Sequence, residues 1–216
     1  MTLLSDIYDV TLKREIRETA NGGFVRPTIG EYFMTHKDWT AVANITPAYL
    51  AAFPGMSGLI TISEDKLTFS NPTGDWTGPY IPIVKYSGKW YIEYKHGGTS
   101  GFGIRDATTV GFPNHYAPLP HVTFIQNNVY QGAAYSYPVT SVTKGNTIAV
   151  GYDVDNHIFT IYHQGELIYT HNVETKHPSY KIPASNGIYF CACGYPDCPI
   201  TIHATPIYTI PGFRYI

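Results

Sequence analysis

The strongest constraint on the fold is residues 143–170, where alternating segments are separated by tight turns. Ile148, Val150, Tyr152 and Val154 alternate with smaller or polar residues, which predicts a strand with one buried face. Residues 158–162 are β-branched and aromatic on both faces, as in a central strand. Residues 167–169 are predicted to form a third strand that runs back antiparallel to it. An antiparallel meander with an apolar face predicts a sandwich of two sheets.

Two turns separate these strands. Asp155-Asn156 is expected to turn because both side chains can bond to nearby backbone and tolerate left-handed geometry. Gln164-Gly165 provides the residue that most easily takes a positive φ in a hairpin. Further upstream, Ile60–Ile62 and Leu67–Phe69 also alternate with polar residues around a Glu64-Asp65 turn, which predicts another pair of strands.

The composition fits strands and turns and excludes several classes of protein. The chain has 216 residues, 19 of them Tyr, and only 14% are charged, which suits one β domain with or without an arm. A net charge of -2 argues against nucleic acid as a partner. The sequence contains no run of 18 apolar residues, so no membrane span is expected. Charges from Asp6 to Glu15 argue against a signal peptide, and three cysteines against a secreted disulfide framework.

The N-terminal part, residues 1–56, is predicted to be a helical and extended arm before a sandwich at 57–216. Residues 3–20 have apolar positions near a 3.6-residue period and end at Asn21-Gly22-Gly23. A second short helix is expected at residues 48–53, after Thr46-Pro47. The apolar stripe of the first helix would pack on its own domain or dock on a neighbouring subunit.

Motifs in order along the chain resemble those of SPRY domains, which have a B30.2-type, concanavalin-like sandwich. Residues 87–94 (SGKWYIEY) and 101–104 (GFGI) are similar to the first half of the family pattern. Residues 145–148 (GNTI), 151–156 (GYDVDN) and 161–165 (IYHQG) are similar to the second half. The resemblance implies an all-β, concanavalin-like antiparallel sandwich that recognises proteins or glycans.

The chain departs from that pattern in three places. Asn146 stands where an acidic residue is usual, and His163-Gln164 replaces Lys-Asn. Residues 106–140 form an insertion with many turn formers and one charged residue, Asp106, and are expected to be a long functional or mobile loop. The Tyr/Thr/Asn/Gly-rich style also resembles SPRY-like modules of bacteriophage tail and other virion proteins.

Residues that could carry metal or acid–base chemistry have a structural interpretation too. Cys191, Cys193, Cys198 and His203 lack the usual spacing of a zinc site, and Cys191 and Cys193 would share one buried face of a strand. Asp153 and Asp155 lie too close in sequence to bracket a substrate, so turn formation is favoured over catalysis or calcium binding. Common enzyme motifs are absent, and we predict no catalysis, no metal and no cofactor.

What remains is a binding surface, because Tyr-rich loops on a rigid sandwich present broad contact area at low entropic cost. Any one Tyr could instead belong to the core or its rim. The candidate binding residues are Trp76, Tyr116, Asn127, Asn128, Tyr130, Tyr135 and Tyr137.

These features predict a non-catalytic virion component, namely a tail- or fibre-associated receptor-binding or decoration protein made in the host cytoplasm. Its partners would be a host surface protein or glycan, and other virion proteins or further copies held through the N-terminal arm. No nucleic acid or membrane insertion is expected. A cellular, cytoplasmic SPRY-type interaction adaptor is the alternative, and a glycan-active enzyme is the third hypothesis.

Overall fold

The computed structural model describes residues 48–53, 58–72, 78–109, 120–132, 135–196 and 198–216. The chain divides into residues 1–45 and 46–216, and every described residue belongs to the second unit. The helix expected at residues 3–20 lies outside the described residues, as do Trp76 and Tyr116. The arm boundary expected near residue 56 stays a prediction.

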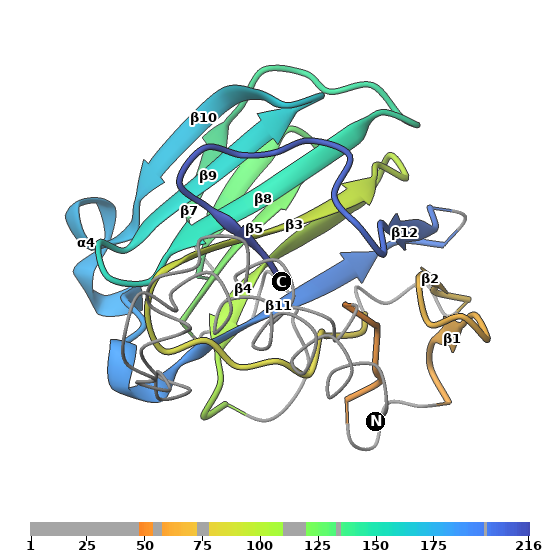
Figure 1. Cartoon of the computed structure of the whole chain (residues 1–216), viewed down its shortest axis with the longest axis horizontal. Helices are drawn as coiled ribbons and strands as arrows, with labels where there is room; N and C mark the ends of the chain where they lie inside the picture. Colours follow the sequence, from red (N-terminus) through yellow and green to blue (C-terminus); the bar gives the residue numbers. More distant parts are fainter. Residues whose placement is uncertain (1–47, 54–57, 73–77, 110–119, 133–134, 197) are drawn as a thin grey trace, which may run out of the picture. The chain divides into compact units, whose positions relative to one another are not determined.

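Two β-sheets make up the described fold (Figure 1). The larger runs in the order β1-β2-β12-β3-β8-β9-β10, and β13 also pairs with β3. Its strands are β1 (Thr61–Ile62), β2 (Thr68–Ser70), β3 (Lys89–Lys95), β8 (Thr147–Asp153), β9 (Ile158–His163), β10 (Glu166–Asn172), β12 (Ile200–Ile202) and β13 (Arg214–Tyr215). The smaller sheet runs β11-β4-β5-β6-β7. Its strands are β4 (Ser100–Asp106), β5 (His121–Ile125), β6 (Asn128–Gln131), β7 (Tyr135–Pro138) and β11 (Ile188–Gly194).

Three short helical segments connect β10 to β11: α4 (Val173–Lys176), η1 (Pro178–Tyr180) and η2 (Ala184–Asn186). Asn172 ends β10 and caps α4, because its side chain accepts a hydrogen bond from the Thr175 amide at 2.9 Å. Lys181 then donates to Glu174 at 2.7 Å, which ties the η1 turn back to α4.

The alternation of residues 148–154 is confirmed as the source of the core. Ile148, Val150, Tyr152 and Val154 are all at most 1% exposed and pack in the main hydrophobic cluster. β8 lies between β3 and β9, so Val150 has Ile92 on one side and Ile161 on the other. Buried residues of the smaller sheet complete this core: Phe102, Ile104, Val122, Phe124, Val129, Phe190 and Ala192. The fold is therefore the expected all-β, predominantly antiparallel sandwich.

The two turns of the meander form, with one difference in the first. Gln164 and Gly165 both have positive φ, 50° and 86°, as the β9–β10 hairpin requires. In the β8–β9 turn, however, the left-handed residue is His157 (φ 55°), not Asp155 or Asn156. The carboxylate of Asp153 organises this turn, which leaves the positive φ to the residue directly before β9.

Two local predictions were wrong. Residues 48–53 form no helix: Ala51 makes an antiparallel bridge with Tyr80, and Leu50 donates its amide to the Lys66 carbonyl at 2.8 Å. These contacts satisfy the backbone in an extended conformation. Within residues 106–140, the expected long loop contains β5, β6 and β7. The described part of this segment is thus largely sheet.

The C-terminal segment covers the outer face of the larger sheet, where it crosses β8 and β9 (Figure 1). Buried Glu93 on β3 anchors it by accepting hydrogen bonds from the amides of Ile207 (2.5 Å) and Tyr208 (2.9 Å). Phe213 then lies over Gly151, where a side chain would collide with its ring. The segment ends in β13, which places Arg214 opposite Trp90.

Within the described residues, no helix is long and apolar enough to cross a membrane.

Val150→Asp should destabilise the sandwich by on the order of 4 kcal/mol, since it buries a charge without a partner. Urea unfolding measures this loss. Thr170→Asp, at an exposed position of β10, is the matched control and should change stability by less than about 0.5 kcal/mol. A Val150→Asp protein as stable as the wild type would contradict the assignment of Val150 to the core.

Candidate functional site

The candidate site lies where the two sheets end on the same side of the sandwich. β7 is the outermost strand of the smaller sheet and β10 that of the larger sheet. On β7, the alternation of side chains sends Tyr135 and Tyr137 to the inner face, opposite Gln131 and Val129 of β6. The α4 helix leaves β10 directly beside them (Figure 1).

A buried amide connects these elements. Gln131 is fully buried, and its Nε2 donates to the carbonyl oxygens of Val173 (2.8 Å) and His177 (3.1 Å). Its Oε1 lies 2.6 Å from Nε2 of His171, which is 1% exposed on β10. Because both amide hydrogens are directed at carbonyls, Oε1 must accept, and we infer that His171 carries its proton on Nε2. We call this contact the Gln131–His171 bridge.

Burial keeps His171 neutral. Loss of solvent, reinforced by the charges of Lys176 and His177, lowers the pKa of His171 to about 4. Its Nδ1 faces the Tyr169 hydroxyl at 3.5 Å, and its ring lies 4.7 Å from that of Tyr137. At neutral pH the imidazole is therefore uncharged and has a structural role, and it does not act as a general acid.

Aromatic rings are exposed above this bridge. The ring of Tyr135, 38% exposed, stacks on that of His177 with centroids 3.2 Å apart, and Tyr180 meets Tyr135 edge-on at 6.1 Å. The Lys176 ammonium lies 5.8 Å from the centroid of half-buried Tyr137. We call Tyr135, Tyr137, Lys176, His177 and Tyr180 the edge surface. It offers ring faces and one cation, which suits recognition of another molecule.

Of the five predicted site residues that the structure describes, it brings Tyr135 and Tyr137 together. Asn127 instead holds a turn, with φ of 64° and its Oδ1 accepting from the Val142 amide at 2.8 Å. Asn128 donates to the Gln126 carbonyl at 3.1 Å and accepts from the Ser136 hydroxyl. Tyr130 lies on the opposite face of β6 from Gln131.

The remaining members of the site were missed by sequence reasoning. Gln131, His171, Lys176, His177 and Tyr180 fit no motif, and Gln131 is 40 residues from His171 along the chain. A weak signal exists in Tyr135-Ser136-Tyr137, whose alternation is that of a strand with two aromatic residues on one face.

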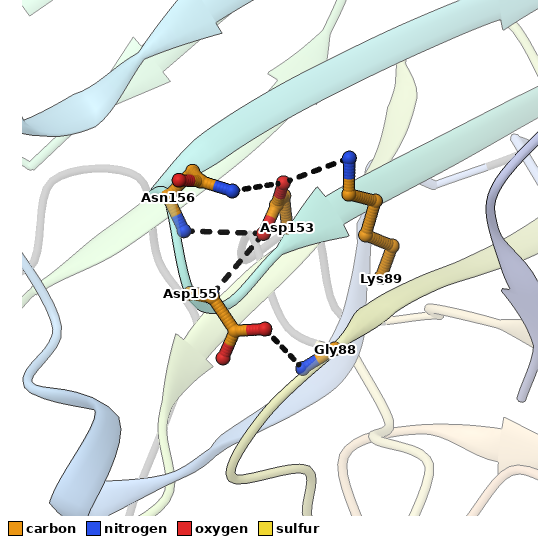
Figure 2. A network of polar contacts seen from close by, with 5 residues as sticks. All are labelled: Gly88, Lys89, Asp153, Asp155 and Asn156. Carbon is orange, nitrogen blue, oxygen red and sulfur yellow. Dashed lines mark hydrogen bonds and ion pairs between the residues drawn. The ribbon is translucent and has the colours of Figure 1, made fainter.

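The two aspartates have structural roles, as predicted (Figure 2). Asp153 accepts from the amides of Asp155 and Asn156 at 3.2 and 3.1 Å, from Asn156 Nδ2 at 2.8 Å, and pairs with Lys89 at 3.3 Å. Burial alone would raise the pKa of Asp153, but the bonds from Asn156 and Lys89 outweigh it and the net pKa is lowered. Asp155 accepts from the Gly88 amide at 3.0 Å, which joins the turn to the start of β3.

The cysteines lie mostly in packed surroundings. Cys191 and Cys193 are both 1% exposed on β11, and Cys191 packs with Phe53 and Tyr189. Burial raises the pKa of the Cys191 thiol to about 12, which disfavours the thiolate that a metal or an electrophile needs. In the part of the chain that the structure describes, no three His, Cys, Asp or Glu side chains are grouped to hold a metal. The absence of a metal stays a prediction.

The low pKa of His171 predicts a pH-dependent stability. As pH falls from about 6.5 to 4, the unfolded chain takes up a proton at this residue before the folded chain does, so stability is lost. His171→Gln should remove about 2 kcal/mol of the difference in unfolding free energy between pH 7 and pH 4. Buried His96, whose pKa is also lowered to about 4, makes stability fall with pH in the same direction. It is unchanged in the variant, so its contribution to the pH dependence should remain. Urea unfolding at both pH values tests this, and an unchanged pH dependence would contradict it.

Comparisons with known proteins agree on the fold. The structure is similar to a stonustoxin structure (TM-score 0.53, 15% identity, 73% of this chain and 27% of that chain). It is also similar to the SPRY domain of human HERC1 (TM-score 0.50, 15% identity, 67% and 94%) and to the TRIM65 PSpry domain (0.53, 11%, 72% and 92%). No protein-family model and no curated sequence matches the chain, which spans about a quarter of the stonustoxin chain. At this identity the likeness concerns the fold alone, and the described residues adopt the SPRY-type β-sandwich.

Proposed function

We propose that this chain is a non-catalytic protein-interaction module and that the edge surface is where its partner binds. The observation that carries the proposal is Tyr135, a half-exposed ring stacked on His177 and held above a buried polar bridge. A Tyr fixed in this way loses little further entropy on binding, and such residues commonly anchor interfaces.

The state of the polar groups supports binding over catalysis. Asp153, Asp155 and Glu93 each accept hydrogen bonds from backbone amides, so their carboxylates are committed to structure. His171 is neutral and buried, and its Nε2 is bound to Gln131. None of these groups is free to transfer a proton to a substrate. The resemblance to SPRY domains also implies recognition of a partner.

The finer hypothesis is that the module belongs to a virion, as a tail- or fibre-associated receptor-binding or decoration protein. It rests on the Tyr/Thr/Asn/Gly-rich style of the sequence and on a docking role for residues 1–20. A cellular interaction adaptor is the alternative, and a glycan-active enzyme the third. Mass spectrometry of purified particles separates the first two, and turnover of a glycan panel identifies the third.

Tyr135→Ala should weaken partner binding about tenfold or more, because it removes the exposed ring that stacks on His177. The melting temperature should stay close to that of the wild type, since Tyr135 is 38% exposed. Tyr137→Ala, at a position packed against the core, should lower both binding and stability.

The partner would first be identified by photo-crosslinking. A variant with a benzophenone side chain at position 135 is irradiated together with extract from the protein's native source. Tyr195, 45% exposed beyond the opposite edge strand β11, is the matched control for both the crosslink and the Ala variant. Binding to the purified partner is then measured by calorimetry. Equal losses for Tyr135→Ala and Tyr195→Ala, or none for either, would refute the edge surface as the binding site.

A further inference from the structure

A second surface gathers cations around one indole ring. The Lys85 ammonium lies 3.5 Å from the centroid of the Trp90 ring, and the Arg214 guanidinium carbon lies 5.7 Å from it. Three separate segments supply these groups: the strand-like stretch before β3, β3 itself and β13. We call Val84, Lys85, Tyr86, Trp90 and Arg214 the basic–aromatic surface.

The backbone holds these residues in place. Lys85 bridges to Ile188 of β11, with both amides donating at 2.8 Å. Trp90 donates its indole N–H to the Ser87 carbonyl at 2.7 Å, which fixes the ring, and β13 pairs Arg214 with Trp90. The surface therefore does not need to order itself when it binds another molecule.

The charges on this surface are not balanced. Neither Lys85 nor Arg214 forms an ion pair with a carboxylate of the described residues. The two acids that contact Gly88 and Lys89, the residues directly before Trp90, are already engaged: Asp153 pairs with Lys89, and Asp155 accepts from the Gly88 amide. Burial, and then the like charge of Arg214, lowers the pKa of Lys85. Two cations that repel each other across one ring indicate a place for an anion.

Two exposed side chains with apolar surface flank Lys85 along the chain. Tyr86 is 59% exposed and Val84 38% exposed, and both lie against Gly187. A phosphate or sulfate needs only the cations, whereas an acidic peptide would use the cations and the apolar side chains together. Nucleic acid is disfavoured because its binding relies on many basic contacts, and the whole chain has a net charge of -2.

We propose that the basic–aromatic surface binds an acidic peptide segment of a protein partner, with carboxylates at Lys85 and Arg214 and an apolar side chain on Tyr86 and Val84. This inference is independent of the edge surface, with which it shares no residue.

The test is a titration of the ¹⁵N-labelled full chain with the peptide Gly-Glu-Glu-Tyr-Glu-Glu-Gly, followed by ¹H–¹⁵N spectra. The indole N–H of Trp90 and the backbone amides of residues 84–88 and 214 should shift. Lys85→Gln combined with Arg214→Gln should weaken binding about tenfold or more. Lys144→Gln, which removes an exposed cation elsewhere, should leave the affinity unchanged. Melting temperatures of both variants establish that the fold is intact.

Three further probes distinguish the source of the anion: the same peptide with Gln in place of Glu, inorganic phosphate, and a sulfated oligosaccharide. The Gln peptide should bind at least tenfold more weakly, and raised salt should weaken the Glu peptide. No shift at Trp90 with the Glu peptide at millimolar concentration would overturn the proposal. Equal binding by the double variant and the Lys144→Gln control would also overturn it. Stronger binding of the sulfated sugar or of phosphate than of the Glu peptide would likewise overturn the proposal that the partner is an acidic peptide.

Discussion

A buried amide on β6 and a buried imidazole on β10 join the two sheets of this sandwich at the side where both sheets end. Gln131 uses both its donors on the carbonyls of Val173 and His177, and its acceptor on His171. The carbonyls of Val173 and His177 also accept from the amides of His177 and Tyr180, whereas the buried amide of Gln131 and Nε2 of His171 would lose these partners without the bridge. Each unsatisfied polar group in a dry environment costs about 1–3 kcal/mol. Gln131 thereby ties β6, whose ladder carries β7, to α4 and to the turn that follows α4.

A second buried polar side chain, that of Glu93, bonds to the backbone of the C-terminal segment in the same way. Glu93 accepts two backbone amides and thereby fixes a stretch that has little regular structure, just as Gln131 fixes the turn after α4. Each anchor positions a surface: the Gln131–His171 bridge supports the edge surface, and the segment held by Glu93 leads to Arg214 beside Trp90. Buried polar groups thus determine where the exposed aromatic rings of this chain lie.

The core could be predicted from the sequence and the sites only in part, for a physical reason. Alternation of large apolar residues from Ile148 to Val154 is a local signal, and it identified the central strand. β6 and β7 carry Asn, Gln, Ser and Pro, so their hydrogen-bonding partners rather than their hydrophobicity make them strands, and residues 106–140 were mistaken for a loop. Tyr135 and Tyr137 were predicted as binding residues from their residue type alone, and their role stays a prediction. The bridge beneath them joins residues 40 positions apart and leaves no local pattern.

Native-state hydrogen exchange of a Gln131→Leu variant tests the central claim most directly. Leu is similar in size but cannot bond to His171 or to the two carbonyls. Exchange should accelerate by about tenfold or more at the amides of β7, α4 and His177. The free energy of local opening there would fall by at least roughly 1.4 kcal/mol. The amides of β3, β4 and β8 should stay as protected as in the wild type. Unchanged exchange at β7 and α4, or an equal acceleration across all strands, would contradict the account.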